Sequence, residues 1–348
     1  MTKTSIGNFF EDFSIGQLLT HATPRTLTSG DASLYTALYG SRFALQSADS
    51  FAMTCGLPQA PLDDLLVFHT VFGKTVPDVS LNAVANLGYA EGRFGVAVYP
   101  GDSLTATSEV IGLKENSSGK TGVVYVRTTG RNQRNEEVLS YVRWVMVQKR
   151  DAASPAPAAQ VPELAKVVSS DGLADNSGFS GKGYDTVLAG SPHLFEDYAG
   201  GERIDHVDGM TVEEADHMIA TRLYQNTAKV HFDQHAASGN RFGRRLVYGG
   251  HVISLARGLS FNGLENAQRI IAINGGRHVA PIFAGDTVYA WTEVLETAPM
   301  PGRDDLGALR LRLVAAKNHP CADFPGASEA HDAVVLDFDY WAAVPRRV

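Results

Sequence analysis

Apolar and polar positions along the chain predict the same order of elements twice. Each half reads as a short strand, a helix of about 15 residues, a looser segment and then several strands. The late segments are rich in β-forming residues and are broken by Gly and Asn, which predicts strands joined by turns. These predicted strands cover residues 104–112, 122–129 and 138–147 in the first half, and 287–295, 308–316 and 333–343 in the second half.

The predicted helix is clearest in the second half. Thr211 is followed three residues later by Glu214, which is the spacing of a capping box at a helix start. One face of this helix is expected to be buried, because apolar residues recur at helical spacing at Ala215, Met218, Ile219 and Leu223. One long helix followed by an antiparallel sheet predicts an α+β layer in which a curved sheet wraps the helix.

The two halves are copies of one module. A shift of 185 positions aligns Phe10-Glu11-Asp12 with Phe195-Glu196-Asp197, and the same shift aligns residues 16, 21, 26, 31 and 38–39 with identical residues of the second half. After a slip of one position, the alignment continues with Gly92-Arg93 on Gly276-Arg277, Gly101-Asp102 on Gly285-Asp286, and Glu109-Val110 on Glu293-Val294. Chance does not keep such a register, so the chain contains an internal duplication.

Two domains and a linker follow from this duplication. The 348 residues are too many for one ordinary core and suit two domains of roughly 150 residues each. We place an N-terminal module at 1–150, a linker at 151–190 and a C-terminal module at 191–348. The linker begins with DAASPAPAAQ and continues as a segment rich in Gly and Ser. A segment of this composition, without hydrophobic periodicity, cannot build a core. We expect the two modules to pair their sheets edge to edge.

Composition and charge exclude several classes of partner. The chain is 44% hydrophobic and 20% charged, with a net charge of −8, which is typical of a soluble globular protein but not of one that binds nucleic acid or an acidic membrane. Cys55 and Cys321 have neither CxxC spacing nor a secretory context, so we expect two reduced thiols. We expect neither a signal peptide nor a membrane span, because the sequence shows no leader pattern and no apolar run of sufficient length. We therefore expect a cytoplasmic protein.

Turn motifs make the expected fold more specific. Pro100-Gly101-Asp102 precedes a predicted strand, and Asn132-Gln133-Arg134 precedes the last strand of the first copy. These motifs and the order of elements resemble the MaoC-type dehydratase branch of hot-dog proteins, over nearly the whole chain. The resemblance implies two tandem hot-dog modules, a double hot-dog, and we expect a homo-oligomer of two or more chains.

The signature motif of that branch is partly kept in the second copy. The branch carries Gly-Asp-x-Asn-Pro-x-His, whereas the second copy reads QNTAKVH over residues 225–231. His231 is therefore kept, while Asn226 replaces the Asp and Lys229 replaces the Pro. The first copy reads GSRFALQ from Gly40 to Gln46 and has lost both catalytic residue types. The resemblance implies that the first module is a structural partner and that the second module carries the active site.

The segment from Tyr224 to Phe232, YQNTAKVHF, is most similar to the mesaconyl-CoA hydratases (2-methylfumaryl-CoA hydratases, or β-methylmalyl-CoA dehydratases). That family also has a degenerate first module. The resemblance implies reversible hydration of mesaconyl-CoA to 3-methylmalyl-CoA, a hydro-lyase reaction. CoA is then part of the substrate, and neither a cofactor nor a metal is expected.

Hydration of an enoyl thioester needs a base, a bound water and donors for the enolate oxygen. Histidine, with an ordinary pKa near 6.5, suits the base, so His231 is the candidate. Asn226 cannot titrate and is expected to hold the attacking water. Gly250 falls where the MaoC branch presents a backbone N–H to the thioester oxygen. Which carboxylate, if any, assists His231 stays open; Asp233 is one candidate, although a helix cap explains it better.

Basic residues near the motif predict binding of anionic parts of the substrate. Arg241, Arg244 and Arg245 precede the glycine pair in an otherwise acidic chain and are candidates for the CoA phosphates. Lys229, and Arg222 four residues before Asn226, are candidates for the free carboxylate of mesaconyl-CoA.

Other functions stay open on the same fold. A thioesterase would need a water-activating carboxylate where this chain has an amide. A 3-hydroxyacyl-CoA dehydratase of monocarboxylic chains would need a purely apolar acyl pocket. A non-catalytic acyl-CoA-binding role is compatible with the altered motif. A metal site built from His231, Asp233, His235 and His251 is disfavoured because no HExxH frame is present.

Overall fold

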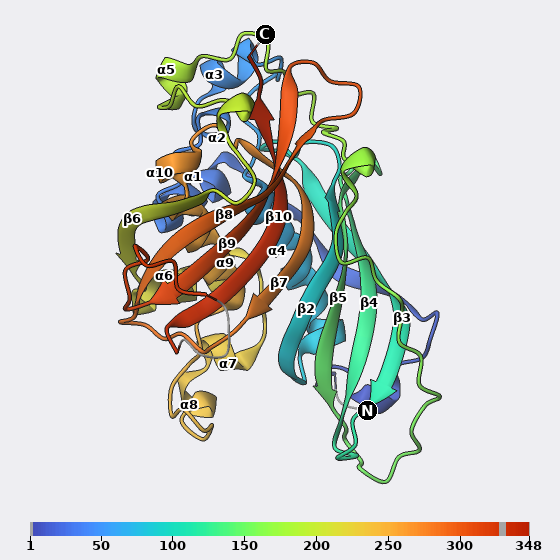
Figure 1. Cartoon of the computed structure of the whole chain (residues 1–348). Helices are drawn as coiled ribbons and strands as arrows, with labels where there is room; N and C mark the ends of the chain where they lie inside the picture. Colours follow the sequence, from blue (N-terminus) through green and yellow to red (C-terminus); the bar gives the residue numbers. More distant parts are fainter. Residues whose placement is uncertain (1–2, 327–331, 348) are drawn as a thin grey trace.

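One long antiparallel sheet organises the protein (Figure 1). The structure, a computed structural model, describes residues 3–326 and 332–347. Within these residues the sheet has ten strands, five from each half, in the order β1-β3-β4-β5-β2-β7-β10-β9-β8-β6. The strands of the first half are β1 (Leu18–Thr26), β2 (Ala83–Phe94), β3 (Ser103–Glu115), β4 (Thr121–Arg131) and β5 (Glu137–Gln148). Those of the second half are β6 (Arg203–Thr211), β7 (Arg269–His278), β8 (Thr287–Pro299), β9 (Leu306–Lys317) and β10 (Val334–Pro345).

The two halves meet through β2 and β7, so the predicted edge-to-edge pairing is confirmed. Gly92 pairs with Ile273 and Arg93 pairs with Ala272. A Cβ on Gly92 would lie 2.8 Å from the Cβ of Ile273, so this close approach requires glycine. The six predicted strands are β3, β4, β5, β8, β9 and β10. The strands β2 and β7 were not predicted.

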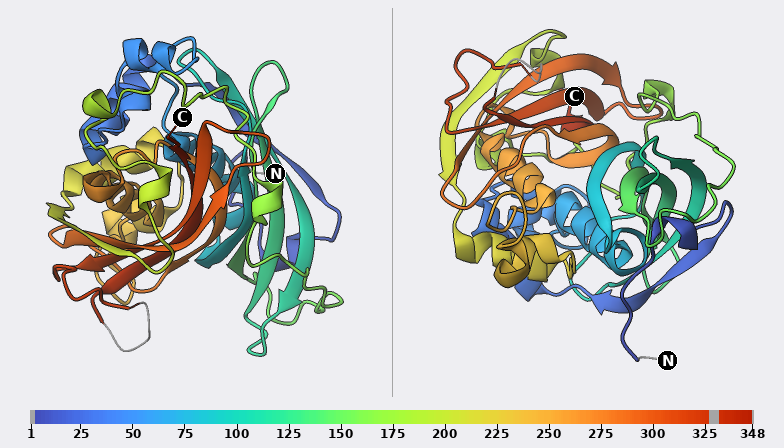
Figure 2. Two further views of the ribbon diagram at one scale, coloured as in Figure 1. Left: turned by 45° about the horizontal axis from the view of Figure 1, so that its top comes forward. Right: turned by 90° about the horizontal axis from the view of Figure 1, so that it is seen from below.

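The helices lie on the concave side of the sheet, where Figure 2 shows them gathered between the two curved halves. The first half contributes α1 (Ser29–Tyr39), α2 (Ala44–Ser47), α3 (Asp49–Thr54) and α4 (Asp64–Thr75), which continues into the π-helical turn η2 (Val76–Ser80). The second half contributes α6 (Glu214–Leu223), α7 (Lys229–Phe232), α8 (Gln234–Ala237), α9 (Gly249–Leu259) and α10 (Phe261–Leu264). Single 3₁₀ turns, η1 (Phe10–Asp12) and η4 (Phe195–Asp197), precede the first strand of each half.

The helices wrapped by the sheet are α4 and α9, which corrects the prediction that α6 fills this place. Every residue of α4 is buried, as are the residues of α9 from Gly250 onward. A helix buried on all sides carries no amphipathic stripe, so both segments looked loose in the sequence. The capping box is also wrong: Thr211 ends β6 and its hydroxyl contacts that of Thr287, while the Glu214 carboxylate pairs with Arg245.

The duplication is confirmed by matched turn contacts. Gly101 and Gly285 both have positive φ, and their N–H groups donate to Leu27 O and Val212 O. A second matched pair is buried under the sheet: His21 Nε2 lies 2.7 Å from Ser108 Oγ, and His206 Nε2 lies 2.7 Å from Thr292 Oγ1. These residues are identical in the two halves because each turn or buried polar contact depends on them.

The segment between the modules runs over the surface and packs on it. It forms a β-bridge between Gln160 and Leu113, the turn η3 (Ser170–Gly172) and α5 (Thr186–Ala189). Val168 and Phe179 are buried, and Val168 O accepts a hydrogen bond of 3.0 Å from Trp341 Nε1. This contact fixes the segment against β10 of the second half.

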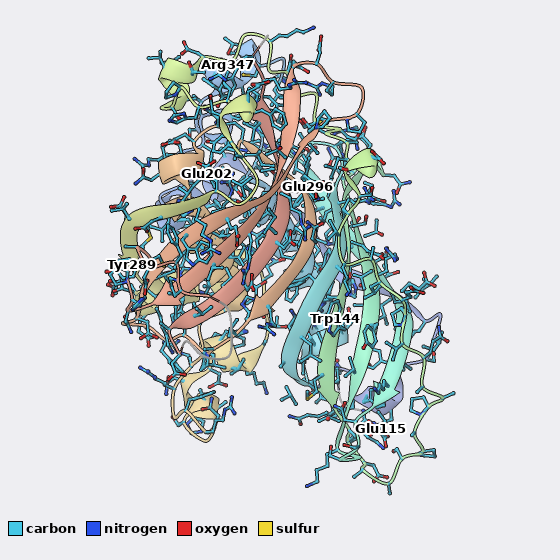
Figure 3. The ribbon with its side chains drawn as sticks, in the orientation of Figure 1. Glu115, Trp144, Glu202, Tyr289, Glu296 and Arg347 are labelled. Carbon is cyan, nitrogen blue, oxygen red and sulfur yellow. The ribbon has the colours of Figure 1, made fainter. Side chains whose placement is uncertain are left out.

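The outer face of the sheet is more polar. Trp144 stacks on Tyr125 there, at 6.0 Å between ring centroids, and the charged side chain of Glu296 on β8 lies on the same face (Figure 3). In the described part of the chain, no helix combines the length and apolar character required for a membrane crossing.

Candidate active site

A cavity of about 410 Å³ lies between the two halves, on the helix side of the sheet. The second half supplies Asn226, His231, Tyr248, Gly249 and His278 to its wall. The first half supplies residues from the end of α4, from η2, and from the inner faces of β2 and β5, among them Phe72, Ser80, Tyr89 and Arg143. The volume is in the range that binds a small organic ligand.

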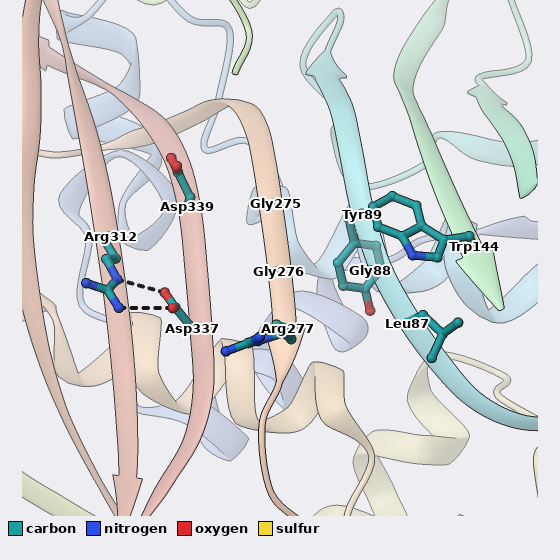
Figure 4. Close-up of a pocket in the computed structure, with 10 residues that line it drawn as sticks. All are labelled: Leu87, Gly88, Tyr89, Trp144, Gly275, Gly276, Arg277, Arg312, Asp337 and Asp339. Atoms are coloured by element: carbon teal, nitrogen blue, oxygen red, sulfur yellow. Dashed lines mark hydrogen bonds and ion pairs between the residues drawn. The ribbon is translucent and has the colours of Figure 1, made fainter. Parts of the chain in front are cut away.

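A second hollow, of about 370 Å³, lies on the opposite face of the sheet at the β2–β7 seam (Figure 4). Its wall includes Trp144, Gly276 and Arg277, and its charges are matched by the ion pair between Arg312 and Asp337. None of the residues predicted for the site lines it. The cavity on the helix side is therefore the candidate active site.

His231 stands in the cavity wall with its tautomer fixed. The residue lies in the short helix α7, and its Nδ1 is 3.0 Å from Leu246 O. A carbonyl oxygen only accepts, so Nδ1 carries the proton and Nε2 keeps its lone pair. Burial lowers the pKa of His231 to about 4, although the Leu246 contact opposes this shift. The imidazole is therefore neutral at physiological pH and can accept a proton through Nε2.

Asn226 lies beside His231 in a tight turn after α6. Its Oδ1 accepts a hydrogen bond of 3.0 Å from Ala228 N, which leaves the NH₂ group for a ligand. A carbonyl oxygen has two lone pairs, so this contact is compatible with the expectation that Asn226 holds the attacking water. The turn packs on α4, where a Cβ on Gly73 would overlap Tyr224 O. Gly73 therefore permits the close approach that places Asn226.

The glycine pair begins the central helix α9, and Tyr248 before it makes no side-chain cap. Gly249 lines the cavity. Glycine is required at this position because a side chain there would overlap the His278 ring. Gly250 is buried one residue further, and a Cβ would lie 2.6 Å from the His69 ring. The first N–H groups of a helix have no partner within the helix, so this end can receive an anion.

The equivalent place in the first half is nearly closed. A hollow of about 20 Å³ there is lined by Ser41, Gln46 and Asp63, the counterparts of Asn226, His231 and Tyr248. Asp63 caps α4 through Leu65 N, and the adjacent Asp64 pairs with Arg269 at 2.8 Å. Carboxylates thus occupy the helix start that is open in α9.

The predicted basic residues are only partly brought together. Arg241 is exposed and lines the cavity mouth. Arg244 is exposed with its guanidinium 3.9 Å above the Phe283 ring, and Arg245 is engaged by Glu214. Arg222 and Lys229 are both exposed and do not line the cavity. Arg222 does not share a helix face with Asn226, because α6 ends at Leu223.

The residues considered as metal ligands in the sequence are found in other settings. Asp233 caps α8 through Ala236 N, as the helix-cap explanation predicts. His251 is buried against the hydroxyl of Tyr39, and His235 is exposed. Among residues 3–326 and 332–347, no group of three or more His, Cys, Asp or Glu side chains is placed to hold a metal ion.

Two cavity residues were missed in the sequence. Burial, with a smaller contribution from His231, lowers the pKa of His278 to about 4. His278 follows the repeated Gly276-Arg277 pair, and the first copy has Phe94 at this position, a difference that could have revealed it. Arg143 lies in a strand that looked like an ordinary sheet element, so no sequence signal separated it from a surface arginine.

Comparisons with known proteins identify the family of this chain. The family model described as Mesaconyl-CoA hydratase matches residues 2–332. The β-methylmalyl-CoA dehydratase of Chloroflexus aurantiacus is 62% identical over 99% of both chains. The mesaconyl-CoA hydratase of Cereibacter sphaeroides is also 62% identical, over 99% of this chain and 100% of the relative.

Solved structures identify the fold. A MaoC domain protein dehydratase from Chloroflexus aurantiacus superposes with a TM-score of 0.97 at 61% identity over 100% of both chains. A Mycobacterium tuberculosis protein described as having a double hot-dog fold gives a TM-score of 0.76 at 26% identity, over 98% of this chain and 99% of that one. The predicted double hot-dog fold is therefore confirmed, and this chain belongs to the mesaconyl-CoA hydratase family of MaoC-like proteins.

Proposed function

We propose that this chain catalyses the reversible hydration of mesaconyl-CoA to 3-methylmalyl-CoA (β-methylmalyl-CoA). Membership of the family supports the reaction, since the two relatives at 62% identity are named for its two directions. The observation that carries the proposal for this site is the position of His231 in the wall of a cavity large enough for an acyl group, with its Nδ1 held by Leu246 O so that Nε2 keeps its lone pair.

The reaction needs one proton to move and one C–O bond to form. Nε2 of His231 takes a proton from water as the water oxygen bonds to the β-carbon of the enoyl group. The π electrons of the C=C bond move toward the thioester, which becomes an enolate. The protonated His231 then returns its proton to the α-carbon, so that one water is added and the base is restored.

The remaining site residues bind and orient the reactants. We propose that Asn226 holds the attacking water through its side-chain amide. The N–H groups at the start of α9, Gly250 with Gly249, are the proposed donors for the enolate oxygen. A donor of this kind contributes about 3–4 kcal/mol to lowering a barrier. Arg241 lines the cavity, and we propose that it binds the CoA phosphates together with Arg244 and Arg245 of the same loop.

Arg222 and Lys229 have less support as substrate contacts. Both are exposed away from the cavity wall, so neither is placed to meet an acyl carboxylate inside it. An exposed lysine or arginine can still reach the outer parts of CoA, and this is the only role that we propose for them.

Three incubations test the proposed reaction against its alternatives. Mesaconyl-CoA should gain one water by mass spectrometry, with ¹⁸O incorporated from labelled water. A thioesterase would instead release free thiol from the saturated butyryl-CoA, and a binding protein would change neither compound. A monocarboxylic hydratase would prefer crotonyl-CoA. Absence of water addition to mesaconyl-CoA, with the chain folded, would refute the proposed function.

We also infer a cytoplasmic homo-oligomer. Cys55 and Cys321 are both buried and unpaired, which suits a reducing compartment. The outermost strands β1 and β6 expose Leu18 and Val207, apolar residues on sheet edges that association would cover. Light scattering coupled to size exclusion should give the mass of at least two chains, and the mass of one chain would refute the oligomer.

A further inference from the structure

Arg143 is a buried arginine in the wall of the candidate active site. It lies on β5 of the first half and is 0% exposed, on the same inner face of the strand as Tyr141 and Val145. Its neighbour Trp144 faces the other side of the sheet (Figure 4). The first half, which has Gln46 in place of a histidine at the position of His231, thus contributes a fixed positive charge to the cavity between the two halves.

The hydrogen bonds of this guanidinium are incomplete. Nη2 donates to Thr75 Oγ1 at 2.6 Å and to Ser80 Oγ at 3.3 Å, and the Cζ atom lies 4.2 Å above the Phe72 ring. Nε and Nη1 are buried and have no partner within the described residues. Burial lowers the pKa of Arg143, and the nearby groups that oppose this effect are tyrosine hydroxyls rather than carboxylates.

Another buried arginine, Arg269 on β7, has the carboxylate partner that Arg143 lacks. Arg269 is 2% exposed and pairs with Asp64 at 2.8 Å. Arg143 makes no ion pair with a carboxylate in the described parts of the chain. Burying a guanidinium without a counter-charge costs several kcal/mol, and a bound anion would offset that cost.

The local backbone around Arg143 is also unusual. Ser80, which accepts from Nη2, ends the π-helical turn η2 that continues α4 into the cavity wall. Such turns are rare and are frequently found at functional sites. Thr75 at the end of α4 supplies the other contact, so two hydroxyls orient one side of the guanidinium while its Nε and Nη1 donors stay unused.

We propose that Arg143 binds the free carboxylate of the acyl group, so that the cavity selects short dicarboxylic enoyl-CoA thioesters. This inference rests on the proposed hydration at His231. In mesaconyl-CoA the carboxylate is attached to the β-carbon, the atom that water attacks. A guanidinium there neutralises the charge that would oppose addition, and it holds the β-carbon in a fixed position relative to His231. Guanidinium is suited to carboxylate because its N–H donors are fixed in a plane.

The consequence is a divided active site. The second half supplies the base and the helix start that receives the thioester oxygen, and the first half supplies the receptor for the opposite end of the acyl group. Arg143 takes the role expected of Arg222 and Lys229, which are exposed outside the cavity. The degenerate module is then a substrate-binding partner and not only a structural one.

Substitution of Arg143 separates carboxylate binding from hydration. Arg143→Met should lower kcat/KM for mesaconyl-CoA by about 100-fold or more, because truncating one partner of a buried charge pair costs 2–5 kcal/mol. The same variant should keep crotonyl-CoA hydration within about threefold, since that substrate has no carboxylate. Arg143→Lys should give a smaller loss for mesaconyl-CoA. The matched control Arg127→Met, on the exposed side of the adjacent strand β4, should change neither value.

A binding measurement removes the dependence on catalysis. Succinyl-CoA and butyryl-CoA, which cannot be hydrated, differ at the acyl terminus by a carboxylate. The wild type should bind succinyl-CoA more tightly, and Arg143→Met should weaken succinyl-CoA by about 100-fold while sparing butyryl-CoA. If the wild type prefers succinyl-CoA but does not hydrate mesaconyl-CoA, the proposed function fails and the Arg143 site stands. If it hydrates mesaconyl-CoA and both Arg143 variants keep the wild-type substrate and ligand ratios, the Arg143 site is refuted. If Arg143→Met does not fold, the ratios of Arg143→Lys decide.

Discussion

Substitution of His231 and of its counterpart Gln46 tests whether the duplicated chain has one active site or two. His231→Ala removes from the cavity wall the imidazole whose Nδ1 is held by Leu246 O. A positioned general base contributes about 10²–10⁴-fold in rate, which corresponds to about 2.7–5.5 kcal/mol of barrier. We therefore expect His231→Ala to lose nearly all turnover, by at least about 100-fold.

Gln46→Ala should leave most of the activity, because its surroundings cannot hold substrate. The hollow beside Gln46 has about 20 Å³, space for about one water, against about 410 Å³ beside His231. The Gln46 amide donates to Gln268 O at 2.9 Å, while its Oε1 is buried without a partner among the described residues. Loss of one such bond costs about 1 kcal/mol of stability and should not affect the distant base.

The assay is steady-state hydration of mesaconyl-CoA, followed by loss of the conjugated thioester absorbance, with both variants shown to be folded by thermal unfolding. Activity of Gln46→Ala should stay within about twofold of wild type. Equal losses in the two folded variants would refute the single-site interpretation. Retention of more than a tenth of the activity by His231→Ala would show that another group is the base.

Three further predictions follow from the geometry. Asn226→Ala should lower kcat by about 100-fold or more without moving the pH profile, because an amide does not titrate; a shifted profile or a wild-type rate would exclude it as the water-holding residue. Burial lowers the pKa of His231 to about 4. The value of kcat/KM for hydration should therefore stay level as the pH falls to about 5, and it should drop only when the imidazole becomes protonated. An acid limb centred near pH 6.5 would contradict a lowered pKa for His231. Gly73→Ala should lower activity and cost about 1–3 kcal/mol of unfolding free energy, because the new methyl group overlaps Tyr224 O. In the control Gly30→Ala the methyl group meets only Thr28 Oγ1, at 3.4 Å, so this variant should be neutral or stabilising. Equal behaviour of the two glycine variants would refute the packing argument.

The repeat could be predicted from the sequence because turn residues keep their role after side chains elsewhere have diverged. Gly101 and Gly285 both occupy left-handed backbone before a strand, and Asp102 and Asp286 both accept a backbone N–H in the same turn. A glycine with positive φ tolerates few replacements. Such positions therefore preserve the register by which the duplication, and with it the double hot-dog fold, is identified.

The central helices could not be predicted in the same way. Helix α4 reads DLLVFHTVFGKT and is buried on every side, so its polar residues Asp64, His69 and Lys74 interrupt any apolar stripe. Each has a specific partner: Asp64 pairs with Arg269, His69 lies 3.2 Å from Ser254, and Lys74 donates to Thr23 O. Only the fold brings these partners together, so the amphipathic helix α6 looked like the better candidate for the central position.

The residues of the candidate site also differ in how far the sequence could identify them. His231 was singled out by the resemblance of residues 225–231 to the MaoC motif, together with the repeat register, which places it opposite Gln46. Arg143 was not, because its meaning depends on the contact between β5 and the end of α4, far apart in the chain. Lys229 was misleading, since motif position alone does not distinguish a cavity residue from an exposed one.

The preference of the wild-type enzyme between mesaconyl-CoA and crotonyl-CoA tests the central claim most directly. Both compounds offer the same conjugated thioester to His231, and only mesaconyl-CoA carries a carboxylate on the carbon that water attacks. We predict that kcat/KM for mesaconyl-CoA exceeds that for crotonyl-CoA by at least about 100-fold, which corresponds to about 2.7 kcal/mol. Equal values for the two substrates would contradict the assignment to a dicarboxylic substrate and would leave a general enoyl-CoA hydratase.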